Sequence, residues 1–155
     1  MVAHSMRPGT APLIVACQMN APRTVLVVDD QPLILAIVAR VLSVAGYGVL
    51  QATDGATALR LFQEEREHIA LVLTDVQMPG ISGVEVGRHI WSTDPSLPVR
   101  YMSGFTAEPL DFLPAGEQER RWIAKPFSGE ELLARLAPYL PSHPQAHRGS
   151  TIRAG

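Results

Sequence analysis

At residues 24–30 the chain reads Thr24-Val25-Leu26-Val27-Val28-Asp29-Asp30, a mostly β-branched apolar run that ends in two acidic residues. Such a run, in which no polar positions alternate with apolar ones, is typical of a strand buried on both faces of a parallel sheet. We therefore predict a central strand here, with both aspartates at its carboxyl end.

Strand and helix patterns alternate along the chain after this run. Further strands are predicted at residues 47–52, 69–74, 98–102 and 121–124, and helices at residues 33–45, 56–65, 83–91 and 130–137. Strands that alternate with helices imply a parallel sheet covered by helices on both faces. Five short βα units in about 118 residues indicate an α/β, flavodoxin-like, doubly wound fold with a five-stranded parallel sheet.

Turn and capping residues support some of these boundaries. Pro32 is tolerated in the first turn of a helix, Gly46 suits a C-terminal cap, and Asp54 can cap the next helix. The segment 104–120 is different, because it contains Gly104, Pro109, Pro114 and Gly116. The fourth helix of the (βα)5 pattern is therefore expected to be short or irregular.

The two ends of the chain differ in composition from its middle. Residues 1–22 and 141–155 hold several prolines and glycines and show no sustained apolar period. We predict a flexible N-terminal extension at 1–22, one folded domain at 23–140 and a disordered C-terminal tail at 141–155. Met19 lies close before the first strand and is a candidate native start.

Composition limits the classes of protein to be considered. Apolar residues make up 46% of the chain and the formal net charge is −2, so neither a disordered chain nor a nucleic-acid surface is expected. Cys17 is the only cysteine, which excludes an internal disulfide and fits a reducing, cytoplasmic location. The apolar stretch before Cys17 is too short for a usual signal core, and no stretch approaches the ~18 apolar residues of a membrane span.

Polar residues stand at four of the predicted strand ends: Asp29-Asp30, Asp75, Ser103-Gly104 and Lys125-Pro126. In open α/β sheets, ligands bind at the carboxyl ends of the strands. Three carboxylates that converge there repel one another and need a cation, and hard oxygen ligands favour Mg²⁺. One carboxylate can then act as a nucleophile toward a phosphoryl group, whose oxygens a lysine and a serine can bind.

Each of these features also has an ordinary structural explanation. An aspartate pair after a strand can be a turn or a helix cap, and Asp75 before Pro79-Gly80 can be a loop residue. A lone lysine is usually solvated, but Lys125 is the only lysine among 13 basic residues, which indicates that a compact ammonium is needed there. The four features in this order on this fold favour the phosphate-handling interpretation.

Four segments resemble the signature blocks of response-regulator receiver domains, the CheY-like modules of two-component signalling: Val25–Asp30, Leu71–Gly80, Met102–Gly104 and Ala124–Phe127. The resemblance covers residues 23–140. It implies that Asp75 is the phosphoryl acceptor, that Ser103 is the switch hydroxyl and that Lys125 binds the phosphoryl oxygens. It also implies that Mg²⁺ is held by Asp30, Asp29, Asp75 and the backbone carbonyl of Gln77.

The sequence departs from the common pattern of that family in three places. Trp122 occupies the position of the switch aromatic, where Tyr or Phe is usual, and the bulky indole is expected to pack. Gln77 and Phe105 occupy positions that tune dephosphorylation in the family. The irregular segment 104–120 falls where the output face normally forms, which favours a stand-alone regulator or a receiver from a hybrid kinase.

The first helix is apolar nearly all round. We expect Ile34, Ile37, Val38, Val41 and Val44 to enter the core. A surplus of apolar residues near the predicted site suggests that Gln31, Pro32, Leu33 and Leu35 help to dock the histidine-bearing partner.

The leading interpretation is therefore a single-domain receiver with no DNA-binding output. Its expected partners are a histidine kinase or histidine phosphotransfer protein and an unknown downstream protein, with no nucleic acid and no membrane. We expect a monomer or weak dimer that is not an enzyme beyond its own phosphorylation and dephosphorylation. Two alternatives stay open: a Mg²⁺-dependent phosphohydrolase with an aspartate nucleophile, and a DNA-binding transcription factor.

Overall fold

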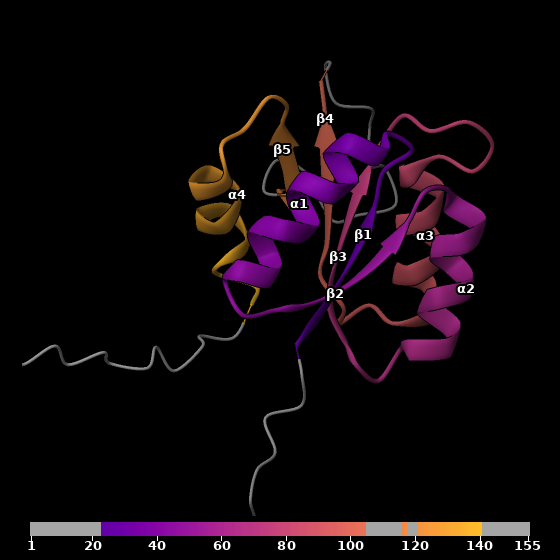
Figure 1. Cartoon of the computed structure of the whole chain (residues 1–155). Coiled ribbons are helices and arrows are strands. Elements are labelled where there is room, and N and C mark those ends of the chain that lie inside the picture. The colour runs from indigo at the N-terminus through magenta and orange to yellow at the C-terminus, as the bar shows by residue number, and fades with distance from the viewer. Residues whose placement is uncertain (1–22, 105–115, 118–120, 141–155) are drawn as a thin grey trace, which may run out of the picture.

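A computed structural model describes residues 23–104, 116–117 and 121–140. Its five strands form one parallel sheet in the order β2-β1-β3-β4-β5 (Figure 1). The strands are β1 (Thr24–Val28), β2 (Gly48–Ala52), β3 (Ile69–Asp75), β4 (Val99–Ser103) and β5 (Trp122–Ala124). This order is that of the flavodoxin-like doubly wound fold, so the predicted fold class is confirmed and every predicted strand is present.

Helices cover both faces of the sheet. They are α1 (Pro32–Val44), α2 (Gly55–Glu65), α3 (Gly83–Thr93) and α4 (Gly129–Leu136). In Figure 1, α1 and α4 lie on one face of the sheet, and α2 and α3 lie on the other. Helix α4 is the helix predicted at 130–137. The irregular helix expected within 104–120 falls almost wholly outside the described residues.

Side chains at the N-caps explain why α2, α3 and α4 begin where they do. The carboxylate of Asp54 accepts a 2.7 Å hydrogen bond from the backbone N–H of Thr57, which confirms Asp54 as the N-cap of α2. Capping boxes open α3 and α4, each with a serine at the N-cap and a glutamate three residues later. Each satisfies N–H groups that a helix N-terminus otherwise leaves without a partner.

The hydrophobic core has one cluster on each face of the sheet. The cluster under α2 and α3 includes Phe62, Ile90 and Tyr101, and the cluster under α1 and α4 includes Leu42 and Met102. Because the central strands β1 and β3 supply residues to both clusters, they are buried on both faces. Their ends are therefore held firmly in place.

The face that α1 turns to the core differs from the predicted one. Its buried side chains are Leu35, Val38, Ala39 and Leu42. Ile37 and Val44 are 50% and 77% exposed, so their predicted burial was wrong, and Leu35 lies in the core rather than on a docking surface. An apolar pattern that runs nearly all round a helix does not select one face.

Within the described part of the chain, no helix has the length and apolar character needed to cross a membrane.

Candidate functional site

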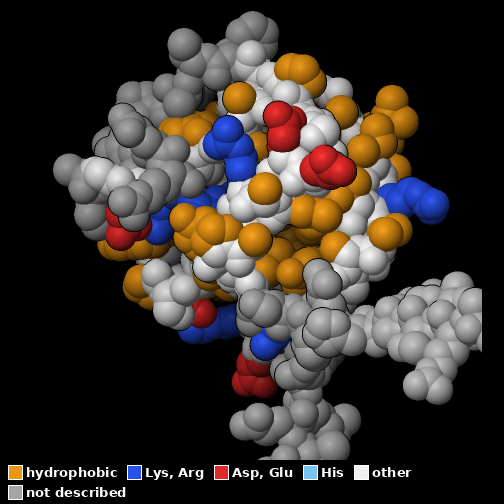
Figure 2. Space-filling view, turned by 90° about the vertical axis from the view of Figure 1, so that its left-hand side faces the viewer, with side chains coloured by type: hydrophobic (Ala, Val, Ile, Leu, Met, Phe, Trp, Pro, Cys, Tyr) orange, Lys and Arg blue, Asp and Glu red, His pale blue; other side chains and the backbone are white. Residues whose placement is uncertain are grey.

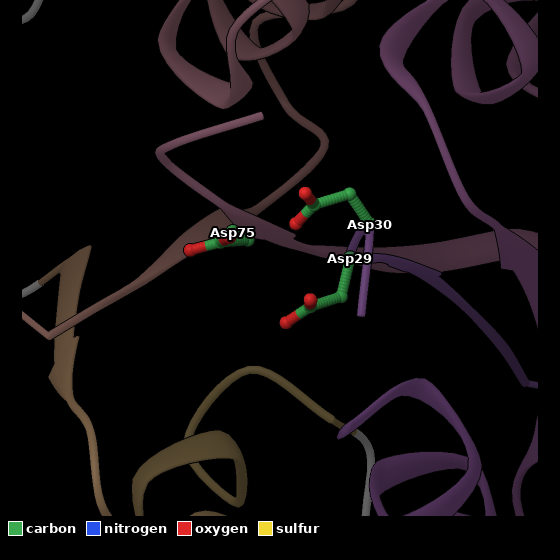
Figure 3. Close-up of side chains that lie close together, drawn as sticks. All are labelled: Asp29, Asp30 and Asp75. Atoms are coloured by element: carbon green, nitrogen blue, oxygen red, sulfur yellow. The ribbon is translucent and has the colours of Figure 1, made fainter. Parts of the chain in front are cut away.

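Three acidic side chains meet at the carboxyl ends of β1 and β3, which are neighbours in the sheet. Asp29, Asp30 and Asp75 each place a carboxylate oxygen within 4.8 Å of the others. Figure 3 shows them leaving adjacent strand ends with their carboxylates directed to the same side. Asp29 is fully buried and Asp75 is 6% exposed, so bulk water screens this cluster poorly.

Lys125 joins the acidic cluster from the far edge of the sheet. Its Nζ lies 2.8 Å from Oδ2 of Asp29 and 3.3 Å from Oδ1 of Asp75. The backbone N–H of Lys125 donates to the carbonyl of Ser103 at 2.8 Å, which ties the end of β5 to the end of β4. The lysine therefore lies between the two buried carboxylates.

The charges in this site are not balanced. Burial raises the pKa of Asp75 above its usual range, the carboxylates of Asp29 and Asp30 raise it further, and the Lys125 ammonium opposes them without cancelling them. Three ionised carboxylates against one ammonium leave an excess of negative charge that a divalent cation would balance. Oxygen donors alone suit Mg²⁺, so the donor set fits the metal that the sequence implies.

The remaining predicted residues border the same edge of the sheet. Ser103 ends β4 and is 8% exposed, and its neighbour Met102 is the register partner of Asp75. Gln77 lies two residues beyond Asp75, in the loop that leads to α3, with an exposed side chain. Phe105 lies outside the described residues.

Trp122 is partly buried and packs on another aromatic ring. Its ring centroid is 5.4 Å from that of Tyr101, with the planes tilted by 43°. Tyr101 is fully buried, and burial raises the pKa of its hydroxyl to about 12. Sequence reasoning did not single out Tyr101, although a tyrosine two residues before Ser103 faces the same side of the strand.

Two further residues hydrogen-bond the backbone of Asp75 or of the residue after it, and both were also missed. The hydroxyl of Thr74 donates to the carbonyl oxygen of Asp75 at 3.0 Å. The N–H of Gly83, at the start of α3, donates to the carbonyl of Val76 at 3.0 Å. A glycine in the first turn of a helix that follows the acidic strand end was the signal available in the sequence.

Comparison with known proteins identifies the family. Residues 25–137 match the family model of the response regulator receiver domain. The chain is 35% identical over 121 residues to the probable transcriptional regulatory protein TcrX of Mycobacterium tuberculosis, a match that covers 77% of this chain and 50% of TcrX. It is 38% identical over 121 residues to the response regulator MprA of Mycolicibacterium vanbaalenii, covering 77% of this chain and 51% of MprA. The chain thus spans about half the length of these curated relatives.

Solved structures give the same result. A response regulator receiver domain protein from Clostridium thermocellum superposes with a TM-score of 0.68 at 28% identity, covering 76% of this chain and 93% of that one. The chemotaxis protein CheY4 of Vibrio cholerae superposes with a TM-score of 0.64 at 31% identity, covering 76% and 98% of the two chains. The chain belongs to the response regulator receiver domain family of two-component signalling.

Proposed function

We propose that this chain takes a phosphoryl group from the phosphohistidine of a histidine kinase or histidine phosphotransfer protein onto Asp75. The observation that carries the proposal is the position of the Asp75 carboxylate. It lies within 4.8 Å of two other carboxylates and 3.3 Å from the Lys125 ammonium. A nucleophile, a cluster able to hold a cation and a group that binds anionic oxygens meet in one place.

The transfer exchanges one bond to phosphorus for another. A carboxylate oxygen of Asp75 attacks the phosphorus, the bond from phosphorus to the histidine nitrogen breaks, and its electron pair returns to the imidazole. Lys125 shifts its ammonium from the carboxylates to the phosphoryl oxygens, and the Ser103 hydroxyl hydrogen-bonds the same group. Mg²⁺ held by Asp29, Asp30, Asp75 and the Gln77 carbonyl would supply positive charge that offsets the repulsion between acceptor and phosphoryl group.

A test of this function needs only a small phosphoryl donor. The purified chain is incubated with acetyl phosphate and followed by intact-protein mass spectrometry, once with Mg²⁺ and once with EDTA. We expect one phosphoryl adduct per chain with Mg²⁺ and almost none with EDTA. Equal labelling in both samples would contradict a metal-dependent site.

An apolar groove beside the site supports docking of a protein donor. It has a volume of about 280 Å³ and is lined by Ile34, Ile37, Val38, Lys125, Pro126 and Phe127. Leu33 is 71% exposed and lies on the same helix. Figure 2 views the side that carries α4 and α1, and hydrophobic side chains gather there. The docking surface proposed for the histidine-bearing partner therefore comprises Leu33 and this groove, without the buried Leu35.

Leu33→Glu is expected to slow transfer from the cognate phosphohistidine donor on the order of tenfold, because it places a charge on an apolar contact. Labelling by acetyl phosphate, which needs no docking, is expected to stay at the wild-type rate. Val44→Glu is the matched control, since Val44 is 77% exposed on the same helix but about 16 Å farther along its axis. A parallel loss of both rates in Leu33→Glu, or an equal loss in Val44→Glu, would contradict docking at this end of α1.

The output of the domain remains a prediction. We propose that the phosphorylated chain acts on a downstream protein in the cytoplasm and that the domain itself binds no DNA. TcrX is named a transcriptional regulatory protein, and the present chain corresponds to about half of its length. A gel-shift assay with random-sequence duplex DNA tests this part of the proposal, and binding at physiological salt would contradict it.

A further inference from the structure

Two residues outside the proposed transfer chemistry, Thr74 and Gly83, contact the backbone at the acceptor. The carbonyl oxygen of Asp75 accepts a 3.0 Å hydrogen bond from the hydroxyl of Thr74. Thr74 is fully buried, so this bond is not exchanged for one to bulk water. If the hydroxyl were removed, the carbonyl would lose that donor in a buried setting, where a lost hydrogen bond is costly.

The first residue of α3 lies directly against the same carbonyl. A Cβ atom on Gly83 would overlap the carbonyl oxygen of Asp75 and would lie 2.8 Å from both the carbonyl carbon of Asp75 and the hydroxyl oxygen of Thr74. Two of these atoms belong to the backbone, which cannot rotate away as a long side chain can. Only a residue without a side chain allows α3 to begin this close to the acceptor.

The residue after the acceptor is fixed at both of its backbone polar groups. The N–H of Val76 donates to the carbonyl of Met102 in β4 at 3.1 Å, and its carbonyl accepts the N–H of Gly83 at 3.0 Å. The next residue along the chain is Gln77, whose carbonyl is a proposed ligand of the cation. The backbone position of Gln77 is therefore constrained from the residues before it. Thr74 contacts Asp75, and Gly83 and Met102 contact Val76.

We infer that Thr74 and Gly83 are positioning residues that hold the Asp75 carboxylate and the Gln77 carbonyl in one geometry suited to Mg²⁺. The inference rests on the proposed function. Groups that orient metal ligands typically change metal affinity by 10- to 100-fold when they are removed. Thr74 acts through a hydrogen bond and Gly83 acts by the absence of a side chain, so the two can be tested separately.

The Thr74 variants test the hydrogen bond at constant shape. Binding of Mg²⁺ alone is measured by isothermal titration calorimetry on the full chain, with Tm recorded in parallel. We expect Thr74→Val, which keeps the shape and removes the hydroxyl, to weaken Mg²⁺ binding on the order of tenfold. Thr74→Ser, which restores a hydroxyl, is expected to bind within about twofold of wild type, within ordinary context effects on a single hydrogen bond.

The Gly83 variant tests close packing against the acceptor. Gly83→Ala is expected to weaken Mg²⁺ binding by a similar factor, because the added methyl group displaces the start of α3 from Asp75. Gly87→Ala is the control, since Gly87 lies in the same helix as Gly83. The three atoms nearest to its added methyl group all belong to Tyr101 in β4, whose hydroxyl it overlaps, and not to the acceptor backbone. Gly87→Ala is expected to lower Tm and to keep the Mg²⁺ affinity of the wild type. If Gly87→Ala loses as much Mg²⁺ affinity as Gly83→Ala, the Gly83 effect is general destabilisation, and the role of Gly83 is overturned.

The outcomes separate this inference from the function on which it rests. Wild-type Mg²⁺ binding with unchanged affinity in Thr74→Val would overturn the role of Thr74 and leave the proposed function intact. If Gly83→Ala fails to fold, the Thr74 pair decides the inference. Absence of both Mg²⁺ binding and phosphoryl labelling in the wild-type chain would overturn the proposed function, and the inference with it.

Discussion

Asp75→Asn is expected to abolish phosphoryl uptake and, at the same time, to stabilise the folded chain. The first effect follows because a neutral amide is not a nucleophile toward phosphorus. The second follows from the raised pKa of Asp75, which burial causes and Asp29 and Asp30 increase. A carboxyl whose pKa is higher in the folded than in the unfolded state is harder to ionise when folded, so its charge destabilises the fold.

The stabilisation has a defined dependence on pH. Where the pH lies above the folded pKa of Asp75, the wild-type carboxylate is ionised and the gain in the asparagine variant is full. The gain shrinks as the pH falls through the folded pKa and vanishes below the unfolded pKa, where the carboxyl is protonated in both states. Added Mg²⁺ also shrinks it, because ligand binding stabilises the wild-type folded state by mass action.

Thermal denaturation of the wild type and of Asp75→Asn checks the prediction, measured from below the unfolded pKa of Asp75 to above its folded pKa. We expect the Tm of Asp75→Asn to exceed that of wild type by a few degrees without metal at a pH above the folded pKa of Asp75, since ~1 kcal/mol shifts the Tm of a domain of this size by about 3 °C. Asp54→Asn is the matched control, because the hydrogen bonds from Thr57 lower the pKa of Asp54 and the sign is reversed. An asparagine at position 75 that destabilises the chain at neutral pH without metal would show that Lys125 outweighs burial and repulsion.

Lys125→Ala is expected to give the second-largest effect on labelling, a loss on the order of a hundredfold, as for removal of one group that binds a developing oxyanion. The ammonium lies 2.8 Å from Asp29 and 3.3 Å from Asp75, so it is already close to where the phosphoryl oxygens will arrive. The variant also leaves the fully buried Asp29 without this ion pair. Lys125→Ala is therefore expected to lower Tm unless Mg²⁺ is present.

Lys125→Arg separates charge from shape. The guanidinium keeps the positive charge, but it is planar and larger than an ammonium, and the lysine side chain is only 18% exposed. We expect Lys125→Arg to recover most of the lost Tm and little of the lost labelling rate, measured as the initial rate with acetyl phosphate. Full recovery of the rate would show that any cation suffices at this position.

The fold could be predicted from the sequence because its central strands are unmistakable. The run at 24–28 and the segment Leu71–Leu73 are continuous apolar stretches. The first is followed by Asp29 and Asp30, and the second leads through Thr74 to Asp75, where the strand ends. Parallel strands bring their carboxyl ends to one edge, so the meeting of Asp29, Asp30 and Asp75 followed from strand order alone. The roles of Ser103, Trp122 and Gln77 remain predictions that rest on the family.

Other features depend on packing that a sequence pattern does not contain. Leu35 and Ile37 are equally apolar, and only the placement of α1 on the sheet decides that Leu35 is buried. Arg100 is 2% exposed in β4, with its guanidinium carbon 3.2 Å from the ring centre of Tyr139. Burial lowers its pKa to about 10. A cation in a strand would ordinarily be expected to face water, so this contact could not be anticipated.

Mapping the phosphoryl group on the wild-type chain tests the proposed chemistry most directly. The chain is labelled with acetyl phosphate and Mg²⁺, reduced with borohydride to convert the acyl phosphate to an alcohol, digested and sequenced by tandem mass spectrometry. The predicted result is reduction at Asp75 alone. Reduction at Asp29 or Asp30 instead would contradict the assignment and favour a hydrolase whose nucleophile lies on the first strand.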